Sequence, residues 1–346
     1  MAGLDRRAEK EVEAWGDRLS RREVFSAEPS IASVDRGSIP AVRAGRLDPL
    51  FRFLTAFFAA LILLLMAGIL FELWQNSRLS LEKFGWHFLV SDAWNPVTQD
   101  FGALVPIFGT VVSTLLAMMI ALPLSLGIAL FLVEMAPPFL QKVIGTAVEL
   151  LAAIPSIIYG MWGLFIFVPI MADHVEPWLG RHAGFLPFFK GPPMGIGMLT
   201  AAIILALMIL PFLTSVARDI FLMVPDLLKE SAYGMGSTTW EVTRDIVIPY
   251  GMRGLVGALF LGLGRALGET MAVTFVIGNS HTLSLSLFSA GNTIASTLAN
   301  EFTEASGPVY LSSLVELGLI LFLITFLVLA ASQLWLKRIT GKEGSR

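Results

Sequence analysis

An arginine and a glutamate stand four positions apart inside the apolar stretch GALFLGLGRALGETMAV, residues 257–273. Arg265 stays protonated, so near the middle of a membrane it needs a carboxylate, carbonyl groups, water or an anion as its partner. Glu269 would lie on the same face of a helix, within reach of an intrahelical ion pair. The two residues are therefore either a structural contact inside a helix bundle or part of a polar passage, in which the arginine meets an anion and the glutamate positions it.

Small and polar residues around this pair leave both interpretations open. The small residues on the arginine face are Ala258, Gly262, Gly268 and Ala272. They permit close helix packing, and they also leave backbone groups open to a passage. Thr270 and Ser156 are further candidates for the passage. For Ser156, which follows Pro155, a kinked helix with a back-bonded serine hydroxyl is the alternative.

The composition predicts an all-α polytopic membrane protein. More than half of the 346 residues are hydrophobic, and the charged residues gather in a few clusters. The absence of cysteine excludes disulfides and cysteine metal sites. The histidines stand far apart without a ligand spacing, which argues against a catalytic metal; they are His87, His174, His182 and His281. Their scatter also argues against a membrane-embedded enzyme acting on lipid phosphates, which would need polar clusters at one interface.

Six apolar runs between the charge clusters are long enough to cross a bilayer. A hydrocarbon core of about 30 Å needs roughly twenty helical residues. The runs cover residues 51–74, 103–133, 143–172, 196–217, 254–277 and 310–336. In the fifth run Arg265 lies close to the bilayer midplane.

Lysine and arginine set the expected orientation. They gather in the N-terminal fifty residues, between residues 218 and 253, and after residue 336. By the positive-inside rule these segments, and with them both chain termini, are cytosolic. The other three connections face outside. The outer segment 279–308 is long for a simple loop, and we expect it to fold back on the bundle.

These assignments divide the chain into four parts. Residues 1–50 are expected to form a solvated, mobile cytosolic extension. Residues 51–100 hold the first transmembrane helix and an outer loop, and residues 101–336 hold a core of five transmembrane helices. Residues 337–346 are a cytosolic tail.

The cytosolic connection between the fourth and fifth runs has signals for two short helices. Pro225 suits the first turn of a helix, and Gly234 or Gly236 ends it. Thr238 and Glu241 have capping-box spacing at the start of a second helix. The connection is therefore predicted to be a compact helical hairpin.

This connection resembles the EAA loop of ABC importer permeases, over about residues 224–250. The resemblance is carried by Glu230, Ser231, Ala232, Gly236, Ile246, Ile248 and Pro249, the last of which is expected to close the second helix. Ser231 and Ile248 depart mildly from the family pattern. The resemblance implies a type I ABC importer permease (MetI-like) fold, in which this loop is the coupling helix that fits a cleft on a cytosolic ATPase. A merely structural hairpin is the alternative.

Large apolar side chains on so small a hairpin favour a protein interface. They are Leu227, Leu228, Tyr233, Met235 and Trp240. The chain also has no GxxxxGK[ST] phosphate-binding loop. We therefore expect no cofactor in this chain and no ATPase site of its own: a partner binds ATP and Mg²⁺ and hydrolyses the ATP.

Three sequence segments, one of which contains Arg265, resemble the phosphate-specific (Pst) branch of these permeases, and most of all its PstC type. The segments concerned are residues 149–165, 214–221 and 265–273, and the resemblance covers the chain from about Phe101 to its end. In that branch the arginine and glutamate of the RALGE segment are implicated in phosphate passage. The roles carry over to Arg265 and Glu269.

The resemblance also implies partners and a location. The partners are a second homologous permease chain (PstA type), two cytosolic ATPase subunits (PstB type), an extracytoplasmic phosphate-binding protein (PstS type), inorganic phosphate and membrane lipid. No nucleic acid is expected, and the location is the bacterial inner membrane. A permease for sulfate, molybdate or tungstate is the alternative.

Overall fold

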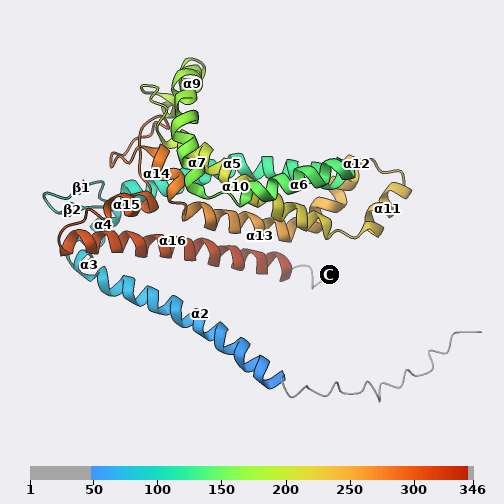
Figure 1. Ribbon diagram of the computed structural model, residues 1–346, viewed down its shortest axis with the longest axis horizontal. Coiled ribbons are helices and arrows are strands. Elements are labelled where there is room, and N and C mark those ends of the chain that lie inside the picture. Colours follow the sequence, from blue (N-terminus) through green and yellow to red (C-terminus); the bar gives the residue numbers. More distant parts are fainter. Residues whose placement is uncertain (1–47, 342–346) are drawn as a thin grey trace, which may run out of the picture. The chain divides into compact units, whose positions relative to one another are not determined.

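The computed structural model describes residues 48–341, with side chains for residues 48–335 (Figure 1). The chain divides into two compact units, residues 1–65 and 66–346. The described part of the first unit is the beginning of helix α2 (Asp48–Asn76), and the other described elements belong to the second unit. The predicted N-terminal extension lies outside the described residues as far as residue 47, and the predicted tail does so from residue 342.

Six helices in the described chain are long and apolar enough to cross a membrane, which confirms the predicted number. They are Asp48–Asn76, Leu104–Met135, Ser156–Ala183, Met198–Leu222, Thr239–Leu267 and Pro308–Trp335. The predicted all-α fold is also confirmed. The described strands are the short antiparallel pair β1 (Trp94–Asn95) and β2 (Asp100–Phe101).

Three of the spans contain π-helical turns, each of which inserts an extra residue into the helix. The second span is α5 (Leu104–Leu130) followed by η1 (Phe131–Met135). The third joins α7 (Ser156–Trp162), η2 (Gly163–Phe167), α8 (Val168–Ile170), η3 (Met171–Val175) and α9 (Glu176–Ala183). The fifth joins α12 (Thr239–Val242), η5 (Thr243–Val247) and α13 (Ile248–Leu267).

The remaining spans are single helices, and short helices connect the spans. The fourth span is α10 (Met198–Leu222), and the sixth lies in α16 (Pro308–Gly341). The connecting helices are α3 (Arg78–Phe84), α4 (His87–Val90), α6 (Pro138–Ala152), the 3₁₀ turn η4 (Pro187–Phe189), α11 (Asp226–Gly234), α14 (Met271–Ile277) and α15 (Ile294–Glu301).

Two of the predicted spans are interrupted. The run predicted over residues 143–172 breaks after α6, where Pro155 takes an extended conformation and α7 begins. The helix predicted over residues 254–277 was wrong at both ends: it begins at Thr239 and stops at Leu267, and α14 is a separate helix. Pro249 does not close the hairpin's second helix, because the helix continues through it: the π-helical turn η5 runs directly into α13, whose second residue is Pro249.

Helix α10 is the central helix of the second unit, and it contacts α5, α6, α13 and α14. Small buried side chains along it, among them Ala201, Ala202 and Ala206, let these neighbours approach closely. By contrast, α2 has no buried residue.

Several connections of the second unit lie at its two ends (Figure 1). Helices α11 and α12 lie at one end, and α4, α15 and the strand pair lie at the other. Contacts join the three connections that were predicted to face outside: the Leu287 N–H donates to the Phe188 carbonyl at 2.8 Å, and Trp94 contacts Glu301. The three connections that were predicted to face outside thus contact one another.

The segment 279–308 folds back on the bundle, as predicted. Its backbone joins that of α10 where the Met198 N–H donates to the Ser289 carbonyl at 3.2 Å. The N–H of Ile294, the first residue of α15, donates to Thr110 Oγ1 of α5 at 2.9 Å. Asn292 and Thr293 are buried in this arrangement.

Candidate functional site

The hairpin of α11 and α12 has the local structure that its sequence predicts. The Thr238 hydroxyl accepts from the Glu241 N–H, and the Glu241 carboxylate accepts from the Thr238 N–H, so the capping box is present. Gly236 follows α11 with φ +90°, in the left-handed region that favours glycine. The N–H groups of Ser237 and Gly236 donate to the carbonyls of Ala232 and Tyr233, the two bonds of a Schellman motif.

The residues of the EAA resemblance divide into an inner and an outer set. Ala232 is buried, in a cluster with Ala129, Phe221, Val242 and Val247, and Ile246 packs against this cluster. Glu230, Ser231, Gly236 and Pro249 are exposed. A larger side chain at Ala232 would have to displace the ends of α5 and α10, whereas the outer set is free to contact another molecule.

The predicted apolar tip of the hairpin is exposed. Leu227, Met235 and Trp240 are 72%, 82% and 68% exposed, and Leu228 and Tyr233 are partly exposed as well. Such a group of large apolar side chains on a small protrusion is the composition of an interface core. We call Leu227, Leu228, Tyr233, Met235 and Trp240 the hairpin tip.

The arginine and glutamate of the predicted passage lie on either side of a helix break. Arg265 is in the last turn of α13, and Gly268 caps that helix. Glu269 belongs to the connection to α14, and its Oε1 accepts from the Ala272 N–H at 3.2 Å. The expected intrahelical ion pair is therefore wrong, because the helix that would have brought the two side chains together ends between them.

Arg265 is exposed on this chain and has no carboxylate partner within residues 48–335. Its guanidinium carbon lies 5.7 Å from the centre of the Phe212 ring of α10. A cation over an aromatic face is oriented without being neutralised. The guanidinium donors therefore remain available to an anion.

The other predicted passage residues stand beside two helices that contact each other. Thr270 precedes α14 and its hydroxyl donates to the Gly268 carbonyl at 3.3 Å, and Ser156 is the first residue of α7. Gly160 of α7 faces the backbone of α14 so closely that a Cβ there would lie 2.9 Å from the Met271 carbonyl oxygen. The two helix breaks thus flank one helix contact. Among the described residues, no hydrogen bond joins Ser156 or Thr270 to Arg265.

An ion pair between distant segments was not predicted. Lys229 Nζ of α11 lies 2.6 Å from Glu134 Oε1 of η1. The two residues are 95 positions apart, so no local pattern signals their contact.

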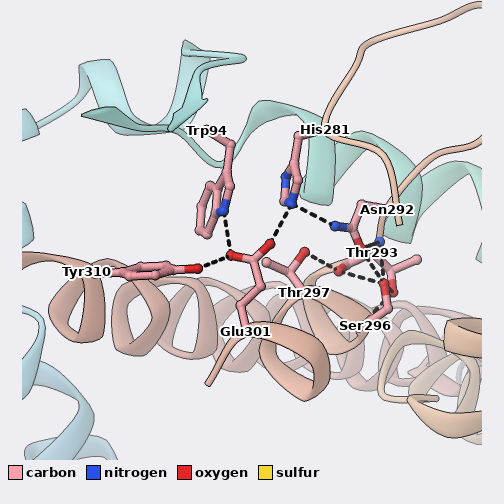
Figure 2. A network of polar contacts seen from close by, with 8 residues as sticks. All are labelled: Trp94, His281, Asn292, Thr293, Ser296, Thr297, Glu301 and Tyr310. Carbon is pink, nitrogen blue, oxygen red and sulfur yellow. Dashed lines mark hydrogen bonds and ion pairs between the residues drawn. The ribbon is translucent and has the colours of Figure 1, made fainter. Parts of the chain in front are cut away.

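A second unpredicted cluster lies at the opposite end of the unit, around Glu301 (Figure 2). Trp94 Nε1 and the Tyr310 hydroxyl donate to Glu301 Oε2, and His281 Nε2 lies 2.7 Å from Glu301 Oε1. The His281 ring also stacks on Trp94, and Asn292 Nδ2 reaches His281 Nε2 at 3.1 Å. Burial of the Glu301 carboxyl raises its pKa, but the hydrogen bonds from His281, Tyr310 and Trp94 outweigh burial and hold the pKa below its ordinary value.

Known proteins resemble this chain in sequence and in fold. The family model of the binding-protein-dependent transport system inner membrane component matches residues 121–341. The phosphate transport system permease protein PstC of Mesorhizobium japonicum is 53% identical over 321 residues, covering 89% of this chain and 98% of that protein. PstC of Pasteurella multocida is 55% identical over 304 residues, covering 87% and 95%.

Two solved structures share the fold at low sequence identity. A bacterial ABC transporter involved in the import of alginate has a TM-score of 0.55 at 15% identity, covering 84% of this chain and 99% of that chain. The inward-facing MetNI methionine ABC transporter has a TM-score of 0.52 at 17% identity, covering 71% and 99%. These likenesses confirm the predicted ABC importer permease fold. The chain belongs to the family of binding-protein-dependent transport system inner membrane components and, within it, to the PstC permeases.

Proposed function

We propose that this chain is the permease subunit of an ATP-driven importer of inorganic phosphate and provides half of the translocation pathway. The observation that carries the proposal is that Arg265 ends a membrane helix without a carboxylate partner among the described residues. A guanidinium in this state offers charge-assisted hydrogen bonds to a tetrahedral oxyanion. Phosphate is favoured over sulfate or molybdate because the similar proteins from Mesorhizobium and Pasteurella are named phosphate permeases.

The energy comes from another chain. The hairpin tip is the docking surface for a cytosolic ATPase, two copies of which bind ATP and Mg²⁺ and hydrolyse the ATP. A second homologous permease chain supplies the other half of the pathway, and an extracytoplasmic binding protein delivers phosphate. Selectivity resides mostly in that binding protein, because one arginine distinguishes poorly between tetrahedral anions.

The location that fits is the bacterial inner membrane, with both chain termini in the cytosol. The positive-inside rule supports this orientation, since α11 and α12 lie within the basic segment 218–253. The end with α15 then faces the binding protein.

In this mechanism ATP draws the two ATPase subunits together and displaces the hairpin. The permease pair then opens alternately to the two sides, and phosphate passes Arg265. Glu269 acts by holding the N-terminus of α14 in place through the Ala272 N–H. Because no carboxylate of the described residues is paired with Arg265, the anion itself neutralises the guanidinium while it passes.

Uptake of radiolabelled phosphate by a bacterium whose own PstC-type permease gene is deleted tests the proposal. Expression of this chain with its partner subunits is expected to restore uptake, and a large excess of sulfate or molybdate is expected to leave uptake unchanged. Uptake that sulfate or molybdate suppresses would assign a different oxyanion. Failure to restore any oxyanion uptake, with the partners co-purifying, would overturn the transport role.

A further inference from the structure

Two side chains of helix α11 are more buried than the others. Of its nine residues, Asp226–Gly234, only Lys229 and Ala232 are not exposed. They are three positions apart and so share one face of the helix, and the hairpin tip residues Leu227 and Tyr233 are exposed. Lys229 and Ala232, together with the backbone on either side, are therefore the main links between α11 and the membrane helices.

The two attachments differ in kind. Ala232 contributes a methyl group to an apolar cluster, which resists separation but has little directional preference. Lys229 reaches the carboxylate of Glu134 at 2.6 Å, and the two side chains are only 14% and 7% exposed. A buried ion pair has strict geometric requirements, and moving one partner away leaves the other charge buried and unpaired. The position of Glu134 is therefore tied to the position of Lys229.

Glu134 lies where a displacement of α11 could reach both the second and the third span. It lies in η1, the last turn of the second span, and only Ala136 and Pro137 separate this turn from α6. Helix α6 ends at the break before α7, and α7 packs on α14 through Gly160. Helix α14 is the element whose N-terminus Glu269 caps, next to Arg265. A continuous series of contacts thus leads from Lys229 to the proposed passage.

An ion pair is not needed merely to attach α11 at this site. Apolar residues of similar size hold buried positions as well or better, because they carry no desolvation penalty. What the ion pair adds is a fixed relative position of α11 and η1. The more exposed pair of Arg218 and Glu149, at 2.8 Å between α10 and α6, has no such requirement, since its carboxylate is 54% exposed and water can replace the contact.

We infer that Lys229 and Glu134 are positioning residues for transport: their buried ion pair carries the displacement of α11 into the second and third spans. The inference rests on the proposed function, because it takes the displacement of α11 to come from a bound ATPase. The inference adds a specific route from the hairpin to the membrane helices. One pair of side chains determines how much of the displacement of α11 reaches these helices.

The test uses the complete transporter reconstituted in vesicles, with phosphate uptake and ATP hydrolysis measured on the same sample. Lys229→Met and Glu134→Gln are each expected to retain the ATPase subunits on co-purification but to lower phosphate uptake per ATP hydrolysed by about tenfold, a typical size for a coupling between sites. The charge-swapped double variant Lys229→Glu with Glu134→Lys is expected to recover most of the ratio. Asp219→Asn is the matched control, since it removes a carboxylate 3.3 Å from Arg218 that is 57% exposed, and it should leave the ratio unchanged.

Each outcome bears on the inference. Single variants with a normal uptake-to-ATP ratio would overturn it, as would single variants that lose the ATPase altogether, because the pair would then only hold the hairpin together. A double variant no better than the single ones would also overturn it. If the unaltered transporter takes up no phosphate, the proposed function fails instead, and the two failures are thus distinguishable.

Discussion

Glu269 accepts a hydrogen bond from the Ala272 N–H at 3.2 Å and does not pair with Arg265, although only four positions separate the two charged side chains. The break at Gly268 gives each side chain a separate role. The carboxylate fixes the start of α14, and the guanidinium lies over Phe212 with its donors available. In the proposed passage, the anion would be the counter-charge of Arg265.

The turn at Gly236 should be essential for coupling. Its φ of +90° is unfavourable for a β-branched residue, so Gly236→Val is expected to destabilise the hairpin turn by about 1–3 kcal/mol. Phosphate uptake per ATP should fall, or the ATPase should detach, as measured in reconstituted vesicles and by co-purification. Gly234→Ala is the control, because Gly234 is helical and a Cβ there meets no atom within 4 Å. A Gly236→Val transporter with normal coupling would count against docking at the hairpin.

The hairpin tip should provide much of the affinity for the ATPase. Trp240 is 68% exposed, and an aromatic residue buried at the centre of an interface commonly contributes about 2 kcal/mol or more. Trp240→Ala should therefore weaken binding of the ATPase roughly thirtyfold or more, as measured by titration in detergent. Trp86→Ala, which removes a still more exposed tryptophan at the opposite end, should not. Equal effects of the two changes would rule out a specific role for the tip.

The contact between α7 and α14 should tolerate no added side chain. A Cβ at Gly160 would lie 2.8 Å from Phe275 Cδ2 and 2.9 Å from the Met271 carbonyl oxygen. Gly160→Ala is thus expected to lower the free energy of unfolding of the purified chain by about 1–3 kcal/mol and to reduce phosphate uptake. Gly127→Ala, where a Cβ meets nothing within 4 Å, is the control for a glycine change in a membrane helix. Unchanged stability and uptake in Gly160→Ala would show that the two helices do not pack this closely.

The Glu301 cluster should make the folded chain sensitive to acid. The pKa of the Glu301 carboxyl in the folded chain is below its ordinary value of about 4.5. The ionised carboxylate therefore stabilises the fold at higher pH. That contribution is lost as the pH falls below about 4.5 and through the folded-state pKa. The unfolding temperature of the wild-type chain should therefore exceed that of Glu301→Gln at pH 6, and the difference should shrink on acidification. A difference that is constant with pH would contradict the assignment.

Features that depend on neighbouring residues could be predicted from the sequence. The six apolar runs follow from membrane thickness, and the capping box of Thr238 and the turn at Gly236 follow from signals within a few positions. Pro155 marked the break before α7. The break at Gly268 was missed because apolar residues continue through α14, although a glycine followed closely by Thr270 is a local signal for a helix end and a new start.

Features that depend on distant residues could not be predicted in this way. The Lys229–Glu134 pair and the contacts of Glu301 with Trp94 and His281 join segments whose proximity only the tertiary structure sets. Hydropathy and helix signals contain no information on which loops meet. The histidine at position 281 therefore looked isolated in the sequence, whereas in the structure it stacks on Trp94.

The most direct test of the central claim is radiolabelled phosphate uptake by the transporter carrying Arg265→Gln, compared with Arg265→Lys. Glutamine keeps a polar side chain but removes the charge, so uptake should be abolished while the complex still assembles on co-purification. Lysine keeps the charge but lacks the planar donor set, and it should restore part of the uptake. Uptake by Arg265→Gln at the wild-type rate would contradict the role of Arg265 in phosphate passage.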